Sequence, residues 1–162
     1  MNTLRVAVAL LAPLLLAACR QASSPPAADI LFHRFVHVDA TGWMRDDTLL
    51  IALPEVDSLT RTEAVLQVRA GQDYPLTTLR LCLLIDDAGG SQRRLVDIPL
   101  YPATDSGAAS LRESPSGVEQ EVSLGEIVLK SGRTATLRVC HAMRQQSVPG
   151  VRSIGLRLTA AP

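Results

Sequence analysis

The segment Thr77-Thr78-Leu79-Arg80-Leu81-Cys82-Leu83-Leu84-Ile85-Asp86 has the clearest structural pattern in the chain. Apolar side chains recur at every second position, which places them on one face of a β-strand: Leu79, Leu81, Leu83 and Ile85. Five turn-forming residues follow, Asp87-Ala88-Gly89-Gly90-Ser91, and they favour a hairpin connection. Alternation resumes over residues 92–100. The two runs therefore predict an antiparallel hairpin that buries one face.

The same pattern extends over most of the chain. Further runs of branched apolar residues, separated by turn residues, predict strands at 30–38, 48–53, 61–70, 118–124, 127–129, 133–144 and 151–159. Residues 103–117 have no periodicity and are expected to form a loop. We therefore predict an all-β chain of about eight strands, an antiparallel β-sandwich of jelly-roll or immunoglobulin-like type. A closed barrel is the competing architecture.

The first residues have the layout of a bacterial lipoprotein signal peptide. Arg5 precedes an apolar run over residues 6–16, which is too short to span a bilayer, since that takes about 20 residues. The run ends in Leu16-Ala17-Ala18-Cys19, the order of a lipobox. Cys19 is then the first mature residue and carries a diacylglycerol on sulfur and a further acyl chain, such as palmitate, on its amino group. The alternative is a conventional signal followed by an incidental cysteine.

These features divide the chain into three parts. Residues 1–18 are the predicted signal peptide, residues 19–29 a flexible tether that starts at the lipidated cysteine, and residues 30–160 a single domain. Two or more acyl chains give stable anchoring, so the lipid bilayer is a predicted partner through Cys19. We expect the protein to face the periplasm. The sequence does not decide whether it is anchored in the inner or in the outer membrane.

Composition argues against a nucleic-acid partner. Sixteen basic and sixteen acidic residues give a net charge of zero, so no basic field is available to hold a phosphate backbone. The aromatic residues are few: Phe32, Phe35, Trp43, Tyr74 and Tyr101. A surface that stacks sugars or bases normally has more of them.

Two cysteines remain after lipidation, Cys82 and Cys140. Each lies in a predicted strand and shares a face with arginine residues, so the two are candidates for neighbours on adjacent strands. In an oxidising compartment they could form a disulfide, whereas the simpler alternative is two separate thiols. The spacing alone leaves both alternatives open.

Metal, cofactor and catalytic patterns are weak. His33 and His37 lie about 13 Å apart along one strand, too far to share an ion. Cys140 and His141 are adjacent and therefore point to opposite faces, so a copper-like site with Met143 is not expected. The acidic pair Asp86-Asp87 is explained by cross-strand pairing with Arg93-Arg94. We predict no metal, no cofactor and no enzymatic activity.

Phe35 and five short segments follow the lipobox in a fixed order: Gly42-Trp43-Met44-Arg45-Asp46, Val65-Leu66-Gln67-Val68-Arg69, Asp73-Tyr74-Pro75-Leu76-Thr77-Thr78-Leu79, His141-Ala142-Met143-Arg144 and Pro149-Gly150-Val151-Arg152-Ser153-Ile154-Gly155-Leu156-Arg157. This order and spacing resembles the GldH family of gliding-motility lipoproteins of Bacteroidetes. The resemblance implies a periplasmic lipoprotein associated with the envelope machinery of gliding and type IX secretion. It implies no known catalytic activity.

The residues that carry the resemblance are structural or partner-binding candidates: Trp43, Arg45, Asp46, Arg69, Tyr74, Pro75, His141, Met143, Arg144, Gly150 and Gly155. We expect Trp43 to cover one end of the core and Tyr74-Pro75 to fix the entry into a strand. Arg45, Arg69 and Arg144 are either separate surface charges or one shared patch for acidic groups of a partner.

Two functions follow as hypotheses. The first is a non-enzymatic, membrane-anchored accessory or scaffold component of envelope machinery, bound to protein partners. The second is a periplasmic module that binds carbohydrate or peptidoglycan. A deep groove near Trp43 and Tyr101 would favour the second.

Overall fold

The structure is a computed structural model that describes residues 29–101 and 111–161. The predicted signal peptide, Cys19 and the tether up to residue 28 lie outside the described residues. Over the described part, the chain contains no apolar helix of bilayer-spanning length.

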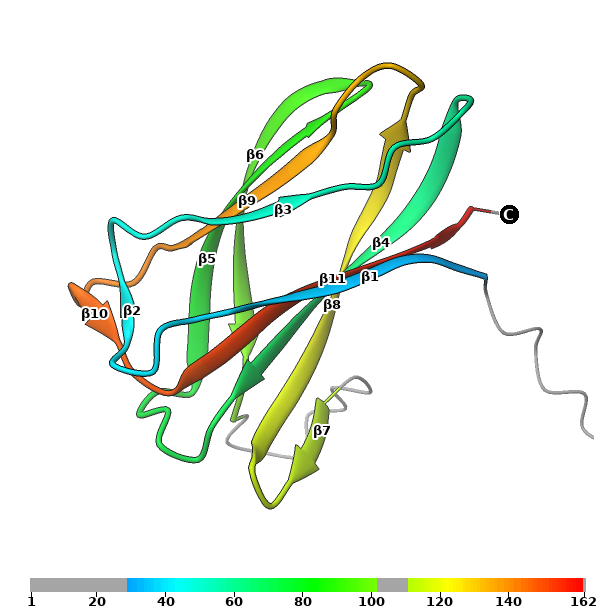
Figure 1. The fold of residues 1–162 in the computed structure, drawn as a ribbon. Coiled ribbons are helices and arrows are strands. Elements are labelled where there is room, and N and C mark those ends of the chain that lie inside the picture. The colour runs from blue at the N-terminus through cyan, green and yellow to red at the C-terminus, as the bar shows by residue number, and fades with distance from the viewer. Residues whose placement is uncertain (1–28, 102–110, 162) are drawn as a thin grey trace, which may run out of the picture.

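Within the described residues, eleven strands form three antiparallel sheets, of which two are large (Figure 1). The five-stranded sheet has the order β1 (Ile30–His37), β11 (Val151–Ala160), β4 (Thr60–Ala70), β8 (Gly117–Leu129) and β7 (Leu111–Ser114). The four-stranded sheet has the order β3 (Leu49–Ala52), β9 (Thr136–His141), β5 (Thr78–Asp87) and β6 (Gly90–Pro99). The third sheet pairs β2 (Trp43–Met44) with β10 (Ser147–Val148). The all-β fold and the antiparallel β-sandwich are confirmed.

The long strands are wound as a set of nested pairs. Without the short strands β2, β7 and β10, the first strand β1 pairs with the last, β11, and the second, β3, pairs with the second to last, β9. Inside these, β4 pairs with β8, and β5 pairs with β6 through a tight turn. Nesting of this kind, shared between two facing sheets, is jelly-roll winding. Of the two sandwich types that the sequence leaves open, the strand pairing is therefore that of a jelly roll and not that of an immunoglobulin-like fold.

The core lies between the inner faces of the two large sheets. Both large sheets bury an apolar row at alternate positions. On β5 it is the predicted row Leu79, Leu81, Leu83 and Ile85, and on β4 it is Ala64, Leu66 and Val68, the inward positions of the predicted strand 61–70. β11 and β9 complete the core with Ile154, Leu156, Leu158, Leu137 and Val139. Each fully buried Leu or Ile contributes about 1.5–3 kcal/mol relative to exposure, so these rows are the main stabilising element of the fold.

Some predicted boundaries were wrong. Residues 118–124 and 127–129 belong to one strand, β8, which continues through an irregular register at Gly125, where φ is +75°. The segment 103–117 is not all loop, because β7 and the turn before β8 lie within it. The strand predicted at 133–144 is shortened to β9. The two-residue strands β2 and β10 are too short to show any period in the sequence.

The predicted charge pairing in the β5–β6 hairpin was also wrong. The register places Asp86 opposite Ser91 and Arg93 opposite Leu84. Asp86 instead forms an ion pair with Arg138 of β9. Asp87 is buried and accepts hydrogen bonds from backbone N–H groups of the turn and of β8.

The domain has two distinct ends (Figure 1). β1 begins at one end, where Ile30 lies opposite Thr159, and runs along the sheet to the other, where His37 lies opposite Ser153. β2 and β10 lie at this second end, next to the start of β11. We call it the motif end, because Trp43, Arg45, Tyr74 and residues 141–150 lie there.

Candidate functional site

The interior of the motif end is built around Trp43 and His141. The Trp43 side chain is 1% exposed, and its indole Nε1 donates to the carbonyl of Asp47 at 3.1 Å. His141, 2% exposed, packs edge-on against the indole with 5.7 Å between ring centroids. Its Nδ1 accepts the backbone N–H of Met143 at 3.4 Å. Burial lowers the pKa of His141, so its ring is neutral at pH 7 and acts as part of the core.

Arg45 holds the loop that follows β9. Its Nη2 donates to the carbonyls of Met143 at 2.9 Å, Gln145 at 3.2 Å and Arg144. Its backbone N–H donates to the carbonyl of Gln146 at 2.8 Å. One guanidinium thus donates hydrogen bonds to several backbone carbonyls of a loop outside the sheet. Lysine cannot reproduce this planar arrangement of donors.

Tyr74 and Gly150 join two further loops at the same end. The buried Tyr74 hydroxyl donates to the carbonyl of Thr78 at 2.9 Å, and burial raises the pKa of Tyr74 to about 12. Gly150 has φ +80°, and a Cβ there would lie 2.5 Å from the Tyr74 backbone nitrogen. The carbonyl of Gly150 accepts the N–H of Gly71 at 2.7 Å. Two effects therefore disfavour any residue other than glycine at position 150: the positive φ angle, and the steric clash of a Cβ with the Tyr74 backbone.

A cleft of about 560 Å³ opens beside this framework, where β9 separates from β5. Its walls are formed by the segment before β5, by the first residues of β5 with their β6 neighbour, and by the loop that Arg45 holds. The lining residues are Leu76, Thr77, Thr78, Arg80, Asp97, Ala142, Met143, Arg144 and Gln145. Two segments of the predicted family pattern, 73–79 and 141–144, therefore meet at one cavity.

The cleft combines charged, polar and apolar groups. Its one carboxylate, Asp97, is bonded to the Arg80 guanidinium at 2.6 and 2.8 Å, and this contact holds the pKa of Asp97 below its usual value. A carboxylate held ionised by an arginine is a poor proton donor. Met143 packs against the core, and its Sδ accepts the backbone N–H of Arg80 at 3.1 Å. Arg144 is exposed on the wall.

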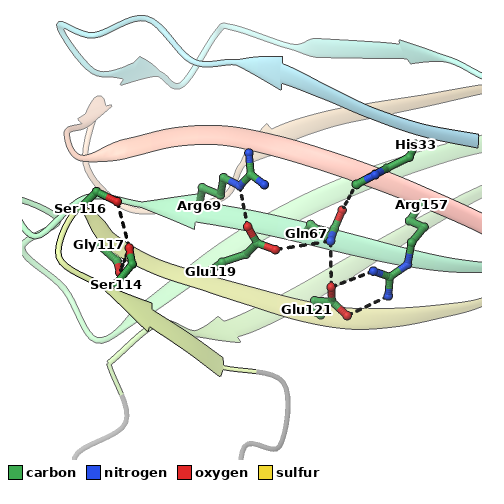
Figure 2. Close-up of polar contacts among 9 residues, drawn as sticks. All are labelled: His33, Gln67, Arg69, Ser114, Ser116, Gly117, Glu119, Glu121 and Arg157. Carbon is green, nitrogen blue, oxygen red and sulfur yellow. Dashed lines mark hydrogen bonds and ion pairs between the residues drawn. The ribbon is translucent and has the colours of Figure 1, made fainter. Parts of the chain in front are cut away.

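Arg69 lies elsewhere, on the outer face of the five-stranded sheet (Figure 2). Its Nε donates to Glu119 at 2.6 Å, and its guanidinium stacks 3.8 Å from the centre of the Phe35 ring. The Phe35 ring covers Gly155, where a Cβ would come within 2.5 Å of the ring. No contact within the described residues joins Arg69 to Arg45 or Arg144. Arg69 and Gly155 thus belong to a structural unit of the sheet face.

The same face carries a linked polar network around Gln67 (Figure 2). His33 Nε2 donates to Gln67 Oε1 at 2.6 Å, and Gln67 Nε2 donates to Glu121 at 2.8 Å. Arg157 binds both carboxylate oxygens of Glu121, at 3.0 and 2.9 Å, and this contact keeps the pKa of Glu121 low. Although Gln67 points outward, it is 3% exposed, because its charged neighbours cover it.

The two cysteines lie on the outer face of the other sheet. Cys82 of β5 is directly opposite Cys140 of β9, so the prediction that they are neighbours on adjacent strands is confirmed. Both are free thiols in this structure. The disulfide stays a prediction.

The other predicted features have simple positions. Asp46 is exposed in the turn after β2, and Pro75 lies between Tyr74 and the cleft residue Leu76. Trp43 is buried and the half-buried Tyr101 donates its hydroxyl to Gly71 at 3.0 Å, so neither ring is presented as a platform for sugar stacking. In the described ranges, no three potential metal-ligating side chains come together.

The sequence matches the family described as GldH lipoprotein over residues 30–158. The chain belongs to the GldH lipoprotein family. The resemblance seen in five short segments is therefore confirmed, and it spans nearly the whole described domain. Membership makes this protein a gliding-motility-associated lipoprotein, and hence a lipid-anchored protein of the cell envelope.

Other comparisons add little to the GldH assignment. No curated protein matches the sequence. A solved structure described as a Podospora anserina GH26-CBM35 β-(1,4)-mannanase is 13% identical, with a TM-score of 0.37. The match covers 83% of the present chain but only 26% of the mannanase chain. So distant a likeness carries no argument about function.

Sequence reasoning missed several residues of the GldH cleft, notably Arg80, Asp97 and Gln145. A usable pattern existed for two of them. If Asp87 and Gly90 close the hairpin as opposite residues, then counting back along both strands places Arg80 opposite Asp97. The role of Gln145 could not be found this way, because it depends on the contact of its carbonyl with Arg45, 100 positions away in the sequence.

Proposed function

We propose that this GldH-family lipoprotein is a non-enzymatic scaffold that binds a protein partner of the gliding and type IX secretion machinery through the cleft at its motif end. The observation that carries the proposal is the meeting of two family-pattern segments, 73–79 and 141–144, at that cleft. They come from opposite halves of the domain, and their shared cavity supports a common function for both segments.

The chemistry of the cleft supports binding of an extended protein segment. Leu76, Ala142 and Met143 offer apolar contacts, and the hydroxyls of Thr77 and Thr78 can hydrogen-bond. The exposed Arg144 offers a charge for an acidic group at the rim. A rigid framework behind the wall, built by Arg45 and Tyr74, lowers the cost of ordering the cleft on binding.

The same contacts support a role without catalysis. Asp97 is held by Arg80, and His141 is buried against Trp43. Asp46 and Asp47 are exposed side by side in a turn, whereas acid–base chemistry on a glycan needs two carboxylates that converge across a cleft.

The proposed location is the periplasmic side of a membrane. β1 starts at the end of the domain opposite the motif end. A chain anchored at Cys19 and entering the domain at Ile30 would therefore present the cleft away from the bilayer. Protease added to intact cells should leave the protein whole, and the same protease added after the outer membrane is permeabilised should degrade it.

Charge reversal at the cleft tests the proposed function. The two variants are expressed in a strain lacking the native protein, and type IX secretion of a reporter cargo is measured. Arg144→Glu is expected to fail to restore secretion. Arg133→Glu, which changes an exposed arginine at the opposite end of the domain, is expected to restore it fully. A photo-crosslinking residue at position 145 should give a discrete adduct with a component of that machinery, absent in the Arg144→Glu background. Equal secretion by both variants at equal protein levels contradicts the proposal.

A second measurement tests the absence of catalysis. Full-length protein should leave peptidoglycan, glycans and peptides unchanged. Turnover that disappears in Asp46→Asn or Asp47→Asn would show an enzyme and refute the scaffold function.

A further inference from the structure

The outer face of the four-stranded sheet carries a pair of thiols in a hollow. Cys82 and Cys140 are half-buried and directly opposite each other on β5 and β9. A pocket of about 330 Å³ lies over them. It is lined by Thr48, Cys82, Leu84, Arg93, Arg138 and Cys140. Both sulfurs are thus reachable from solvent and belong to one site.

The backbone already places the two residues within disulfide range. Directly opposed residues of an antiparallel pair have Cα atoms about 4.5–5.5 Å apart. Disulfides form across Cα separations of about 4.4–6.8 Å. The Cys140 Sγ lies 3.8 Å from the Cys82 carbonyl oxygen, which shows that its side chain leans toward the neighbouring strand. Rotation of two side chains, with no movement of the sheet, can bring the sulfurs together.

The surroundings of the two thiols differ. The guanidinium Nε of Arg93 donates to Cys82 Sγ at 3.2 Å, and a hydrogen-bonded cation stabilises a thiolate. Among the described residues no cation donates a hydrogen bond to Cys140, and burial, with the neighbouring Cys82, raises the pKa of its thiol more than the charge of Arg93 lowers it. The second arginine of the pocket, Arg138, is bound to Asp86 instead. Cys82 is therefore the better nucleophile of the two.

We propose that Cys82 and Cys140 form a thiol–disulfide exchange site, in which Cys82 attacks a low-molecular-weight disulfide and Cys140 then closes a bond between β5 and β9. Nothing in this inference depends on the partner-binding cleft, which lies at the end of the same sheet.

The reaction proceeds in two balanced steps. The Cys82 thiolate forms a bond to one sulfur of the incoming disulfide R–S–S–R, and the other sulfur leaves as RS⁻ with the electron pair of the broken bond. Cys140 then loses its proton to the solvent or to the departed thiolate, and its sulfur attacks Cys82 Sγ. The second RS⁻ leaves. Overall, two protein thiols are oxidised by two electrons, and one disulfide is reduced to two thiols.

Oxidised glutathione is the probe for the test. Full-length lipoprotein, extracted in detergent and reduced, is mixed with oxidised glutathione, quenched with iodoacetamide and mapped by peptide mass spectrometry. The wild type should form the Cys82–Cys140 disulfide. Cys140→Ser should stop at a glutathione adduct on Cys82. Cys82→Ser should react at Cys140 about tenfold more slowly, because Arg93 donates to Cys82 Sγ and because partial burial raises the pKa of the Cys140 thiol despite the nearby Arg93 charge.

A matched pair of arginine variants tests the activation of Cys82. Without the Arg93 hydrogen bond, the Cys82 thiolate loses the cation that stabilises it, so the first step should slow roughly threefold. Arg93→Met should show that reduction, and Arg138→Met, which removes an arginine from the same pocket without touching sulfur, should not.

Three results would overturn the inference. The first is an absence of the Cys82–Cys140 bond at every ratio of oxidised to reduced glutathione. The second is faster modification of Cys140 than of Cys82 in the single-cysteine variants. The third is an equal effect of the two arginine substitutions on the rate at Cys82.

Discussion

The outer faces of the two large sheets differ in how completely their side chains are engaged. On the five-stranded sheet, Arg157, Glu121 and Gln67 form a connected network, and Arg69 links Glu119 to the Phe35 ring. On the four-stranded sheet, the Arg80–Asp97 and Arg138–Asp86 pairs lie among half-buried thiols and leucines. Leu50 and Leu95 are 56% and 64% exposed there.

The difference separates a surface whose side chains stabilise the fold from a surface whose side chains can react or bind. A face whose polar groups bind each other has little left to offer a partner or a reagent, and its charges act mainly on stability. On a face with free thiols and exposed apolar side chains, these groups remain accessible to a reagent or a partner. The comparison predicts that substitutions on the five-stranded face change stability, whereas substitutions on the four-stranded face change reactivity.

The largest expected effect is the oxidation of the four-stranded face. Cys82 and Cys140 are 58 positions apart, and closing a loop of that length should raise the free energy of unfolding by about 4 kcal/mol. Urea denaturation with and without reductant measures the difference. The double variant Cys82→Ser, Cys140→Ser should show no dependence on reductant. If the free energy of unfolding of the wild type were also independent of reductant, the proposed difference between the two faces would be contradicted.

The next effect concerns Glu121 on the five-stranded face. Glu121→Gln should lower the free energy of unfolding at pH 7 by about 2 kcal/mol, because Arg157 loses its charged partner in a partly buried setting. Denaturation midpoints at pH 7 provide the measurement. On the same strand, Glu126→Gln removes an exposed pair with Arg61 and should cost less than about 0.5 kcal/mol. Equal losses would mean that the network has no special role.

The wild type and Glu121→Gln are also expected to differ in how their free energies of unfolding depend on pH. The pKa of Glu121 is lowered in the folded state, so its contribution is fully present above the unfolded pKa of about 4.3 and is lost as pH falls through the folded value. Acid should therefore destabilise the wild type more than Glu121→Gln, and the two stability curves should converge at low pH.

A smaller effect is expected where Arg69 stacks on Phe35. A double-mutant cycle of Arg69→Met and Phe35→Leu should give a coupling of about 0.5–1 kcal/mol, the range for partly exposed cation–π contacts. The same cycle with Arg61→Met, which has no ring contact among the described residues, should give none. A coupling indistinguishable from this control would remove the stack from the stabilising unit.

The smallest effect is predicted at Leu95. Leu95→Ser should change the free energy of unfolding by less than about 0.5 kcal/mol, because the side chain is already in water. Ile98→Ala, on the same strand but fully buried, should cost about 2–5 kcal/mol. Similar losses at both positions would show that the four-stranded face is covered in solution.

Alternation predicted which side chains are inside with good accuracy. The rows on β4 and β5 are buried as expected, because a strand with one apolar face has only one way to place it. Alternation does not say which strands are neighbours, so the nested pairing could not be predicted. Gln67 shows a further limit: alternation with Leu66 and Val68 places it on the outer face, where a side chain is normally exposed, and only the side chains around it on β1 and β8 explain its burial.

The candidate site was harder to predict than the fold. Trp43 and Tyr74 were expected to be structural from their type and position, and the structure places both in the core. Arg45 was ambiguous in the sequence, because its partners are backbone carbonyls that have no residue-specific pattern. The cleft itself arises where β9 leaves β5, a departure that depends on tertiary contacts of the following loop.

The nested strand order also governs when this domain can acquire its shape. β11 lies between β1 and β4, so the wider sheet stays divided until the final long strand has been synthesised. Pairings between remote parts of a chain form slowly, on scales of milliseconds to seconds for comparable topologies. A nascent polypeptide halted before Val151 would hold β1 with no neighbour to pair with. We expect such a fragment to expose unpaired strand edges, and therefore to be bound by chaperones or degraded before it can work as a lipoprotein.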